Sequence, residues 1–440
     1  MAEKELLSNC YLDYKKNKTT YDKMNNYYNN ESDARKNYQI ITDRINNILD
    51  VNFIQKFIAE ESSYVLGNPI TYSSYTDNVD AVNAIRDNIR HWSVKHDREL
   101  LNESLKFNIG YELYFIDKIG RFSSIICNPT SCYILEDDFG NIELFIRFYT
   151  KRFDKTNTIY ADVYESTTII HYRVLANNFE QIGNIDENMF GRVPVSMVYI
   201  GSLYESIYAR IKNLQDALQT NMSDNSNEIS DFRASYIKMT GCKIDGTTKG
   251  EDGLTDLQRM KKLGILNLPS KDSDVAWLMK NFNDSYVQNN LNNIEDKIYQ
   301  MSSHINYNEK MQSNLSGTAL RSRLLSLEMK CKNNIQAMQD CIKNRIEFLF
   351  LYLYKKTGVA YNVGDINLTF TPSIPTDDFL TAQMISQLGD KISTKTALSQ
   401  LSFINNPDLE MKQIEEENQA DSIGNDLLTN SDGSDNNATN

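Results

Sequence analysis

The most constraining feature of this chain is a run of apolar residues spaced for one very long helix. The run consists of Leu320, Leu324, Leu327, Cys331, Ile335, Met338, Ile342, Ile346, Leu349 and Leu353. It advances three turns every eleven residues, close to the 3.6 residues per turn of an unstrained helix. With Ser316 as N-cap and Gly358 after the last turn, the helix would be about 60 Å long. Such a helix needs packing partners along its length, so the fold has to be built around it.

Shorter helices and a strand-rich segment surround this element. Apolar spacing predicts helices over Ile41–Val65, Val79–Asn108, Ile207–Met222 and Val287–Ile305, and Gly67-Asn68-Pro69 ends the first. β-branched and aromatic runs predict strands at Tyr111–Asp117, Phe122–Cys127, Cys132–Leu135, Ile142–Phe153, Thr158–Tyr164, Thr168–Leu175, Tyr236–Thr240 and Ile366–Phe370. Short helices are expected from Thr376, the cap of the first one, to about Asn418. Helices around a mainly antiparallel meander give an α+β fold class.

Composition excludes several classes of protein. The 440 residues include 46 Lys and Arg against 59 Asp and Glu, a net charge of -13. This balance argues against tight, sequence-specific DNA binding by the whole surface, although it leaves room for a local basic patch. The N-terminus lacks a secretory signal pattern, and no apolar run approaches the roughly 18 residues that span a bilayer. The six cysteines lack CxxC spacing, so we expect reduced thiols and no zinc site.

Motifs of enzyme chemistry are absent from the sequence. It contains no GxxxxGK[ST], HExxH or GxSxG motif, and no GxGxxG after a strand. The acidic clusters have structural interpretations: a hairpin turn at Asp137-Asp138, a helix N-terminus at Asp377-Asp378 and a solvated helix face at Glu415–Glu417. The four histidines are interpreted as structural or surface residues. We therefore predict a protein that is not an enzyme and needs no cofactor.

One charge asymmetry stands out against the acidic background. Residues 316–345 carry six Lys and Arg against two carboxylates, and we single out Arg321, Arg323 and Lys330 as a basic face of the long helix. A solvated face is the plain interpretation. The alternatives are pairing with acidic neighbours in an assembly, or contact with a polyanion.

Five short motifs, in one order along nearly the whole chain, resemble the portal proteins of long-tailed phages of Gram-positive bacteria, the siphophage portal family. They are Leu66-Gly67-Asn68-Pro69-Ile70, Arg192-Val193-Pro194-Val195, Met222-Ser223-Asp224, the segment Ser316-Gly317-Thr318-Ala319-Leu320-Arg321-Ser322-Arg323 continuing to Glu328, and Asn406-Pro407-Asp408-Leu409-Glu410. The fourth is the most specific, and it is similar to the family's tunnel-loop exit and long kinked helix.

The resemblance implies a portal fold with an α/β wing, long stem helices, a small α/β clip, a tunnel loop and a helical crown. The implied parts are a wing (1–201), stem helices (202–233 and 281–304) around a clip (234–280), a tunnel loop (305–316), a long wing helix with its returning strand (317–376), crown helices (377–418) and an acidic tail (419–440) expected to be disordered. Two departures limit the transfer, since the clip is short and the tail matches no known role.

The resemblance also implies a function and a set of partners. It implies a ring of about twelve subunits at a capsid vertex of the virion, assembled in the host cytoplasm, that passes double-stranded DNA without reading its sequence. The implied partners are the terminase large subunit, a head-completion or adaptor protein, and the major capsid and scaffolding proteins, with no membrane. Candidate channel residues are Asn308, Lys310, Gln312 and Asn314, and candidate docking residues in the clip are Arg259, Lys261 and Lys262. The alternative is a non-enzymatic helical scaffold or adaptor of another intracellular assembly.

Overall fold

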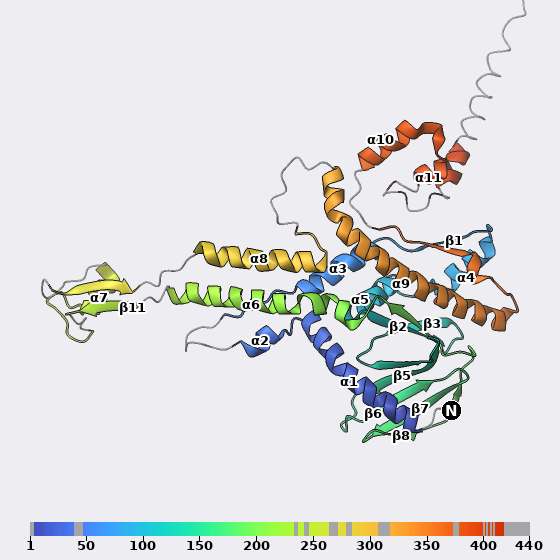
Figure 1. Cartoon of the computed structure of the whole chain (residues 1–440), viewed down its shortest axis with the longest axis horizontal. Coiled ribbons are helices and arrows are strands. Elements are labelled where there is room, and N and C mark those ends of the chain that lie inside the picture. The colour runs from blue at the N-terminus through green and yellow to red at the C-terminus, as the bar shows by residue number, and fades with distance from the viewer. Residues whose placement is uncertain are drawn as a thin grey trace, which may run out of the picture. The chain divides into compact units, whose positions relative to one another are not determined.

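The computed structural model describes residues 4–38, 47–232, 236–241, 246–263, 272–278, 284–306, 317–372, 378–398, 401, 404, 407 and 410–417. The chain divides into two compact units (Figure 1). Unit 1 comprises Met1–Asn314 and Arg321–Pro372, and unit 2 comprises Leu315–Leu320 and Ser373–Asn440. Unit 1 mixes helices with antiparallel sheets, which confirms the predicted combination of helix and sheet.

The largest sheet of unit 1 is the predicted antiparallel meander. Its strands run in the order β4 (Cys132–Glu136), β5 (Ile142–Thr150), β6 (Ile159–Tyr164), β7 (Thr168–Leu175) and β8 (Asn178–Gln181), with β9 (Asp186–Glu187) paired to β7. Helix α1 (Lys4–Tyr28) covers one face, where Tyr14 stacks on Phe148 with ring centroids 4.3 Å apart. Apolar residues at helical spacing on α1 thus meet residues at alternating positions on the strands.

A second sheet covers the opposite face of β5. It has the order β10 (Val195–Tyr199), β2 (Ile109–Ile116) and β3 (Phe122–Cys127). Phe145 of β5 is fully buried against it, and its ring lies 5.8 Å from that of Tyr111. Because both faces of β5 are covered, Leu144, Phe145 and Ile146 are all buried, although successive side chains of a strand point to opposite faces.

The long helix α9 (Gly317–Thr357) has 41 residues, about 60 Å at 1.5 Å per residue, as predicted. It ends at Gly358, whose φ of 78° is the left-handed conformation that glycine adopts after a helix. The predicted apolar positions from Leu324 to Leu353 are buried, except for the half-buried Ile335. Packing partners along α9 include Glu61 of α3 (Phe53–Leu66), Glu112 of β2 and the backbone of Gly120.

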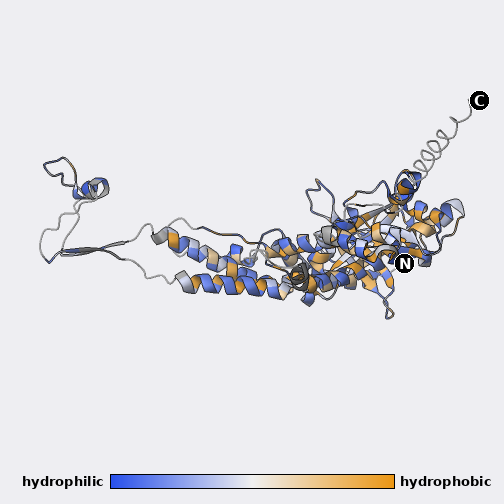
Figure 2. Cartoon of the chain, turned by 90° about the horizontal axis from the view of Figure 1, so that it is seen from above, coloured by the Kyte–Doolittle hydropathy of each residue, from blue (hydrophilic) through white to orange (hydrophobic). Residues whose placement is uncertain are grey.

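Two long antiparallel helices form the most extended part of unit 1. Helices α6 (Ile207–Phe232), preceded by η1 (Leu203–Glu205), and α8 (Asp284–Ser302) pack side by side (Figure 1), and both are hydrophilic over much of their surface (Figure 2). Between them in sequence, β11 (Tyr236–Thr240) pairs with β12 (Asp274–Leu278), next to α7 (Asp256–Leu263) in the chain.

Polar side chains at four-residue spacing along α6 bind the segment 47–54. Gln215 accepts hydrogen bonds from the backbone N–H groups of Phe53 and Ile54, Ser223 from that of Leu49 and Asn227 from that of Asn47. Gln219, between them, donates to Asp50 and accepts from Ser32. We call these four α6 side chains the α6 ladder. They satisfy backbone groups that an irregular segment would otherwise leave unpaired.

The helix predicted over Ile41–Val65 is wrong in its first part. Residues 47–52 are not helical, and α3 begins only at Phe53, where Asn52 accepts a hydrogen bond from Gln55 as the N-cap. The α6 ladder supplies the reason, since it binds the backbone groups that a helix would use. The predicted residues 41–46 lie outside the described residues.

The helix predicted over Val79–Asn108 is two helices. Helix α4 (Val79–Ile89) is separated from α5 (His96–Phe107) by a turn in which the ring of Trp92 stacks on Phe122. Five strands were not predicted: β8, β9, β10, β12 and β1 (Thr71–Ser74). Strand β1 pairs with β13 (Ile366–Thr369), which follows η2 (Val363–Asp365). Helix α2 (Asp33–Asn37) lies beside α6.

Unit 2 contains short helices, as predicted. They are α10 (Asp378–Leu388), η3 (Gly389–Lys391), α11 (Thr394–Leu398) and a helical stretch at 410–417, where Glu415–Glu417 are exposed as expected. The predicted caps Ser316 and Thr376 and the acidic tail 419–440 lie outside the described residues. Within the described part of the chain, we find no helix with the length and apolar character needed to cross a membrane.

Candidate functional site

The predicted channel residues Asn308, Lys310, Gln312 and Asn314 lie outside the described residues, but the segments on both sides of them are described. The chain before them ends α8 at Ser302 and continues to Asn306, and the chain after them is α9. Residues of both flanks meet at one buried carboxylate, Glu61 of α3. We call Glu61, Ser302, His304, Lys330 and Asn334 the Glu61 cluster.

Glu61 is fully buried and is held by α9. The Nζ atom of Lys330 lies 2.6 Å from Glu61 Oε1, a contact between opposite charges, and Asn334 Nδ2 donates to Glu61 Oε2 at 2.8 Å. Lys330 also donates to the backbone carbonyl of Ser302 at 3.2 Å, so it joins the end of α8 to α3. A buried carboxylate is stable only with such partners, and here they come from the two flanks of the 307–316 segment.

His304 completes the cluster from the first flank. Its ring stacks on Phe57 at 4.0 Å, its Nδ1 lies 2.9 Å from the carbonyl oxygen of Ser302, and its Nε2 lies 3.4 Å from Glu61 Oε1. Burial lowers the pKa of His304, Glu61 partly opposes this and Lys330 adds to it, with the result that the pKa is about 4. His304 is therefore uncharged at neutral pH, and the Glu61 cluster contains a single ion pair.

This depressed pKa predicts how stability depends on pH. The unfolded chain takes up a proton at His304 near pH 6.5, but the folded chain does so only near pH 4. The stability contributed by this group is thus present above pH 6.5 and is lost as pH falls towards 4, by about 1.4 kcal/mol per pH unit. We expect His304→Gln to remove this part of the slope in urea unfolding curves recorded across that range. The matched control His91→Gln, at an exposed histidine, should leave the slope unchanged, and an equal change in both variants would refute the assignment.

A second buried cluster fixes α9 to the sheet of β2. Arg345 donates through Nε to Glu112 Oε2 at 2.9 Å and through Nη1 to Asp97 Oδ1 at 2.7 Å. His96 and Ser124 both contact Glu112 Oε1. Burial alone would raise the pKa of Glu112, but the charge of Arg345 and the hydrogen bonds from His96 and Arg345 hold it at about 2. Arg345, counted above among the cations of the long helix, is buried and does not belong to an exposed face.

The other predicted cations have different surroundings. Lys330 forms an ion pair with Glu61. Arg321 and Arg323 lie on α9, and their side chains are outside the described part of the structure. In the predicted clip, Arg259 pairs with Asp252 at 2.5 Å and with Asp256 at 3.5 Å, and Lys262 is exposed. The side chain of Lys261 lies outside the described part of the structure. The described contacts of Arg259 are with Asp252 and Asp256, not with the Glu61 cluster.

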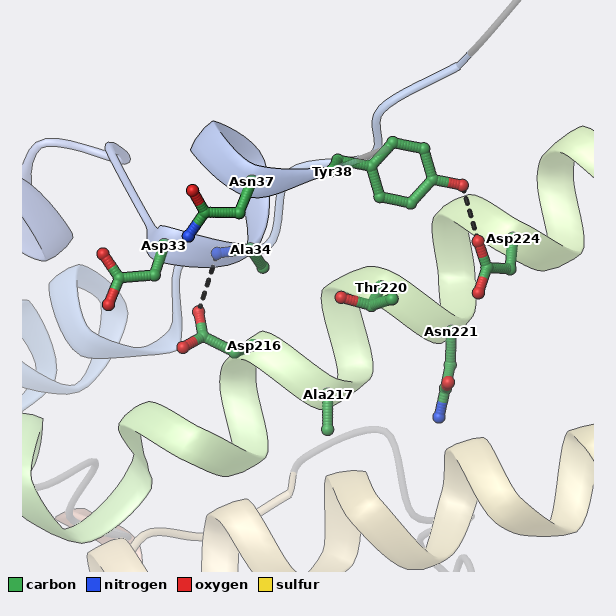
Figure 3. A pocket seen from close by; sticks show the side chains of 9 residues that line it. All are labelled: Asp33, Ala34, Asn37, Tyr38, Asp216, Ala217, Thr220, Asn221 and Asp224. Atoms are coloured by element: carbon green, nitrogen blue, oxygen red, sulfur yellow. Dashed lines mark hydrogen bonds between the residues drawn. The ribbon is translucent and has the colours of Figure 1, made fainter. Parts of the chain in front are cut away.

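An open hollow of about 560 Å³ lies between α2 and α6 (Figure 3). Its carboxylates already have partners within the chain, since Asp216 accepts from Tyr27 and from the backbone of Ala34, and Asp224 accepts from Tyr38. No group of His, Cys, Asp and Glu in the described part of the chain could hold a metal ion.

Sequence reasoning missed Glu61, although a signal for it exists. Glu61 stands four residues after Phe57 and four before Val65, at a position where the helical pattern places an apolar residue. A carboxylate at such a position requires a buried partner. The pattern cannot say that this partner is Lys330, which lies far away in the sequence.

A family model described as "Phage portal protein, SPP1 Gp6-like" matches residues 7–423 of this chain. A relative, the portal protein of Bacillus phage SPP1, is 22% identical over 426 residues, covering 90% of this chain and 82% of the relative.

Two similar solved structures are titled as parts of gene transfer agent (GTA) particles. A chain from the neck of an empty GTA particle, computed with C6 symmetry, has a TM-score of 0.49 and 9% identity, over 78% of this chain and 87% of that one. A chain from the neck of a native GTA particle, computed with C12 symmetry, has a TM-score of 0.45 and 11% identity, over 79% and 88%.

Proposed function

The chain belongs to the phage portal protein family, SPP1 Gp6-like, and on this premise we propose that about twelve copies form a ring through which double-stranded DNA enters and leaves a capsid. A portal protein is a component of the capsid vertex of the virion. The observation that carries the proposal is the family match, which extends over residues 7–423 of the 440. Ring formation, the passage of DNA, the number of subunits and assembly in the host cytoplasm are proposals.

The proposal assigns the two units to the parts of a portal. Residues 1–201 and 317–376 form the wing, the pair α6 and α8 forms the stem within 202–233 and 281–304, and 234–280 forms the clip. Residues 305–316 form the tunnel loop that faces DNA, 377–418 form the crown, and 419–440 form an acidic tail. The Glu61 cluster supports this division, because it joins the two flanks of the 307–316 segment to the α3 helix of the wing.

A closed ring requires one surface of the chain to bind a different surface of the next copy. Twelve copies with a charge of -13 would carry about -156 in total. An acidic conduit of this kind discourages DNA from sticking, so only sparse cations should contact phosphates. The proposed mechanism is therefore positioning and passage of DNA, with no catalytic step.

Mass measurement tests the ring directly. Native mass spectrometry and negative-stain microscopy of the full chain should give rings of about 608 kDa, twelve times 50.7 kDa. Co-expression with capsid and scaffolding proteins serves as the second condition. A protein that stays monomeric in both conditions would contradict the ring and favour the helical scaffold or adaptor interpretation.

The tunnel-loop assignment predicts an effect on packaging. We expect Lys310→Glu to reduce the DNA packaged per particle several-fold, because it replaces a cation near DNA by a charge that repels phosphates. The residues Asn308, Gln312 and Asn314 would line the same loop. Packaged DNA is measured by gel after nuclease treatment of particles. Lys297→Glu, at an exposed position of α8, is the matched control, and equal packaging by both variants would remove Lys310 from the channel.

The clip assignment predicts an effect on docking. We propose that the clip cations Arg259, Lys261 and Lys262 bind the terminase large subunit and the head-completion protein, and that Arg321 and Arg323 form the basic face of the long helix. Reversal of the three clip charges should weaken terminase binding at least tenfold in a pull-down. Lys249→Glu changes an exposed charge of the same segment and is the control. Normal binding by the triple variant would exclude a docking role.

A further inference from the structure

Unit 1 gathers uncompensated positive charge at one end. Three segments meet there: the α4–α5 corner (86–99), the β2–β3 turn (117–121) and the last turn of α9 (352–357). Together they carry eight Lys and Arg against four carboxylates, a net charge of +4 in a chain of -13. We call the exposed cations of these segments that form no ion pair with a described carboxylate the basic end; they are Arg86, Arg90, Lys95, Arg98, Lys118, Lys355 and Lys356.

An aromatic column holds the three segments together. The ring of Trp92, in the corner, stacks on Phe122 at 5.9 Å, and Phe122 lies 6.0 Å from the ring of Tyr352 in α9. Trp92 also donates to the carbonyl of Phe122, and Tyr352 donates to that of Gly120 at 2.6 Å. The corner and the end of α9 accordingly lie at the same end of the unit (Figure 1).

The cations of the basic end have no carboxylate partners among the residues that the structure describes. Two of the four carboxylates of the same segments are already engaged, since Asp97 is bound by the buried Arg345 and Asp117 by Arg121. Lys355 and Lys356 donate to uncharged oxygens, the carbonyl of Met189 and the hydroxyl of Tyr352. The positive charge of the basic end therefore remains available to a partner.

Two cations of the basic end lie at the N-terminus of α5, where the helix dipole does not favour positive charge. Lys95 is the N-cap of α5, without a side-chain capping hydrogen bond, and Arg98 follows in the first turn. Cations at this end oppose the helix dipole, by about 0.3–1 kcal/mol each at an exposed site. Asp97 and Glu99 offset part of this cost. Lys355 and Lys356, by contrast, lie at the C-terminus of α9, where the helix dipole favours positive charge. The dipole alone would account for the presence of these two lysines.

We propose that the basic end binds the phosphate backbone of double-stranded DNA outside the channel, on the packaged genome. This proposal rests on the proposed function for the presence of DNA. Phosphates suit the surface because spread, exposed Lys and Arg side chains bind DNA without reading its sequence. Three large hydrophobic side chains are also exposed in these segments, Val94 (98%), Ile119 (72%) and Tyr354 (55%). Scattered exposed apolar residues are ordinary on protein surfaces and are weak evidence for a protein partner. The seven cations are the stronger indication, and they favour a polyanion.

A covalently closed circular duplex tests the basic end separately from the channel, because a circle has no end to thread through a ring. Binding of the circle to the full-length protein is measured by filter retention between 50 and 200 mM NaCl. We expect the variant Arg86→Gln, Arg90→Gln, Lys95→Gln, Arg98→Gln to bind at least tenfold more weakly. The slope of log affinity against log salt should fall by about 0.9 for each lost phosphate contact.

A matched variant removes four other exposed cations: Lys16→Gln, Lys23→Gln, Arg152→Gln and Lys155→Gln. It should keep most of the affinity, and an equal loss would show that binding follows total charge only and would overturn the proposal. No binding of the circle by the wild type, or unchanged affinity of the basic-end variant, would also overturn it. Unchanged DNA binding with a loss of incorporation into capsids would assign the surface to an acidic protein. Ring mass, measured on the same samples, tests the proposed function independently.

Discussion

Replacing Arg345 by methionine should lower the free energy of unfolding by about 3–5 kcal/mol, the largest single effect expected in this chain. The substitution removes the guanidinium that binds Glu112, whose side chain is fully buried. Glu112 would keep its contacts with His96, Tyr114 and Ser124, but it would lose the permanent positive charge of Arg345. Removing one member of a buried pair is costly because the remaining charge has lost its solvent as well as its partner.

Trp92 provides a local readout, since its ring lies 5.2 Å from the guanidinium carbon of Arg345. The chain has two tryptophans, so Trp277→Phe leaves Trp92 as the single reporter in urea unfolding. Lys343→Met, at an exposed position of the same helix, is the control and should change little. The double variant Arg345→Met, Glu112→Leu should recover much of the loss, because no buried charge remains. A single variant as stable as the control would refute the account of this cluster.

Replacing Lys330 by methionine should cost about 3 kcal/mol at pH 8, because it leaves Glu61 buried without its cation. The cost should be smaller near pH 5. Lys330 contributes to the low pKa of His304, so its removal raises that pKa, and a protonated His304 can then balance Glu61. Urea unfolding at the two pH values measures this difference.

Lys332→Met is the matched control for this prediction, at an exposed position two residues away on α9. It should change stability little at either pH. If the Lys330 variant loses the same stability at both pH values, His304 is not coupled to Glu61. If it loses none, the buried carboxylate has another partner and the Glu61 cluster does not anchor the flanks of the 307–316 segment.

Much of the fold could be predicted because local patterns agree with the final packing. Strands β3 and β7 have their predicted bounds, since turns on both sides delimit their runs of β-branched and aromatic residues. Helix α9 was predictable because one apolar stripe extends along all of it. The hairpin at Asp137 was predictable as well, because an Asp side chain can accept from the backbone N–H groups that follow it, here those of Phe139 and Asn141.

The remaining features depend on contacts between distant parts of the chain. The residues before Phe53 fit a helical pattern, but side chains of α6 bind their backbone instead. The two buried clusters consist of pairs such as Glu61 with Lys330, and the spacing of apolar residues contains no information about which charges meet. The family resemblance supplied the class of protein, and yet the proposed channel and clip residues still await a direct test.

The α6 ladder has a consequence for how this protein can vary in evolution. Three of its four side chains, Gln215, Ser223 and Asn227, bind backbone N–H groups of residues 47–54, and every amino acid except proline offers the same N–H there. Leu49 or Phe53 can therefore be exchanged without loss of these bonds, whereas a change at Gln215 abolishes two of them at once. Apart from Asp50, whose side chain accepts from Gln219, the contact is therefore specified by the side chains of α6 and not by those of the segment that it binds. Among homologues, the helix should be the slow-changing side of this contact and the segment it holds the fast-changing side.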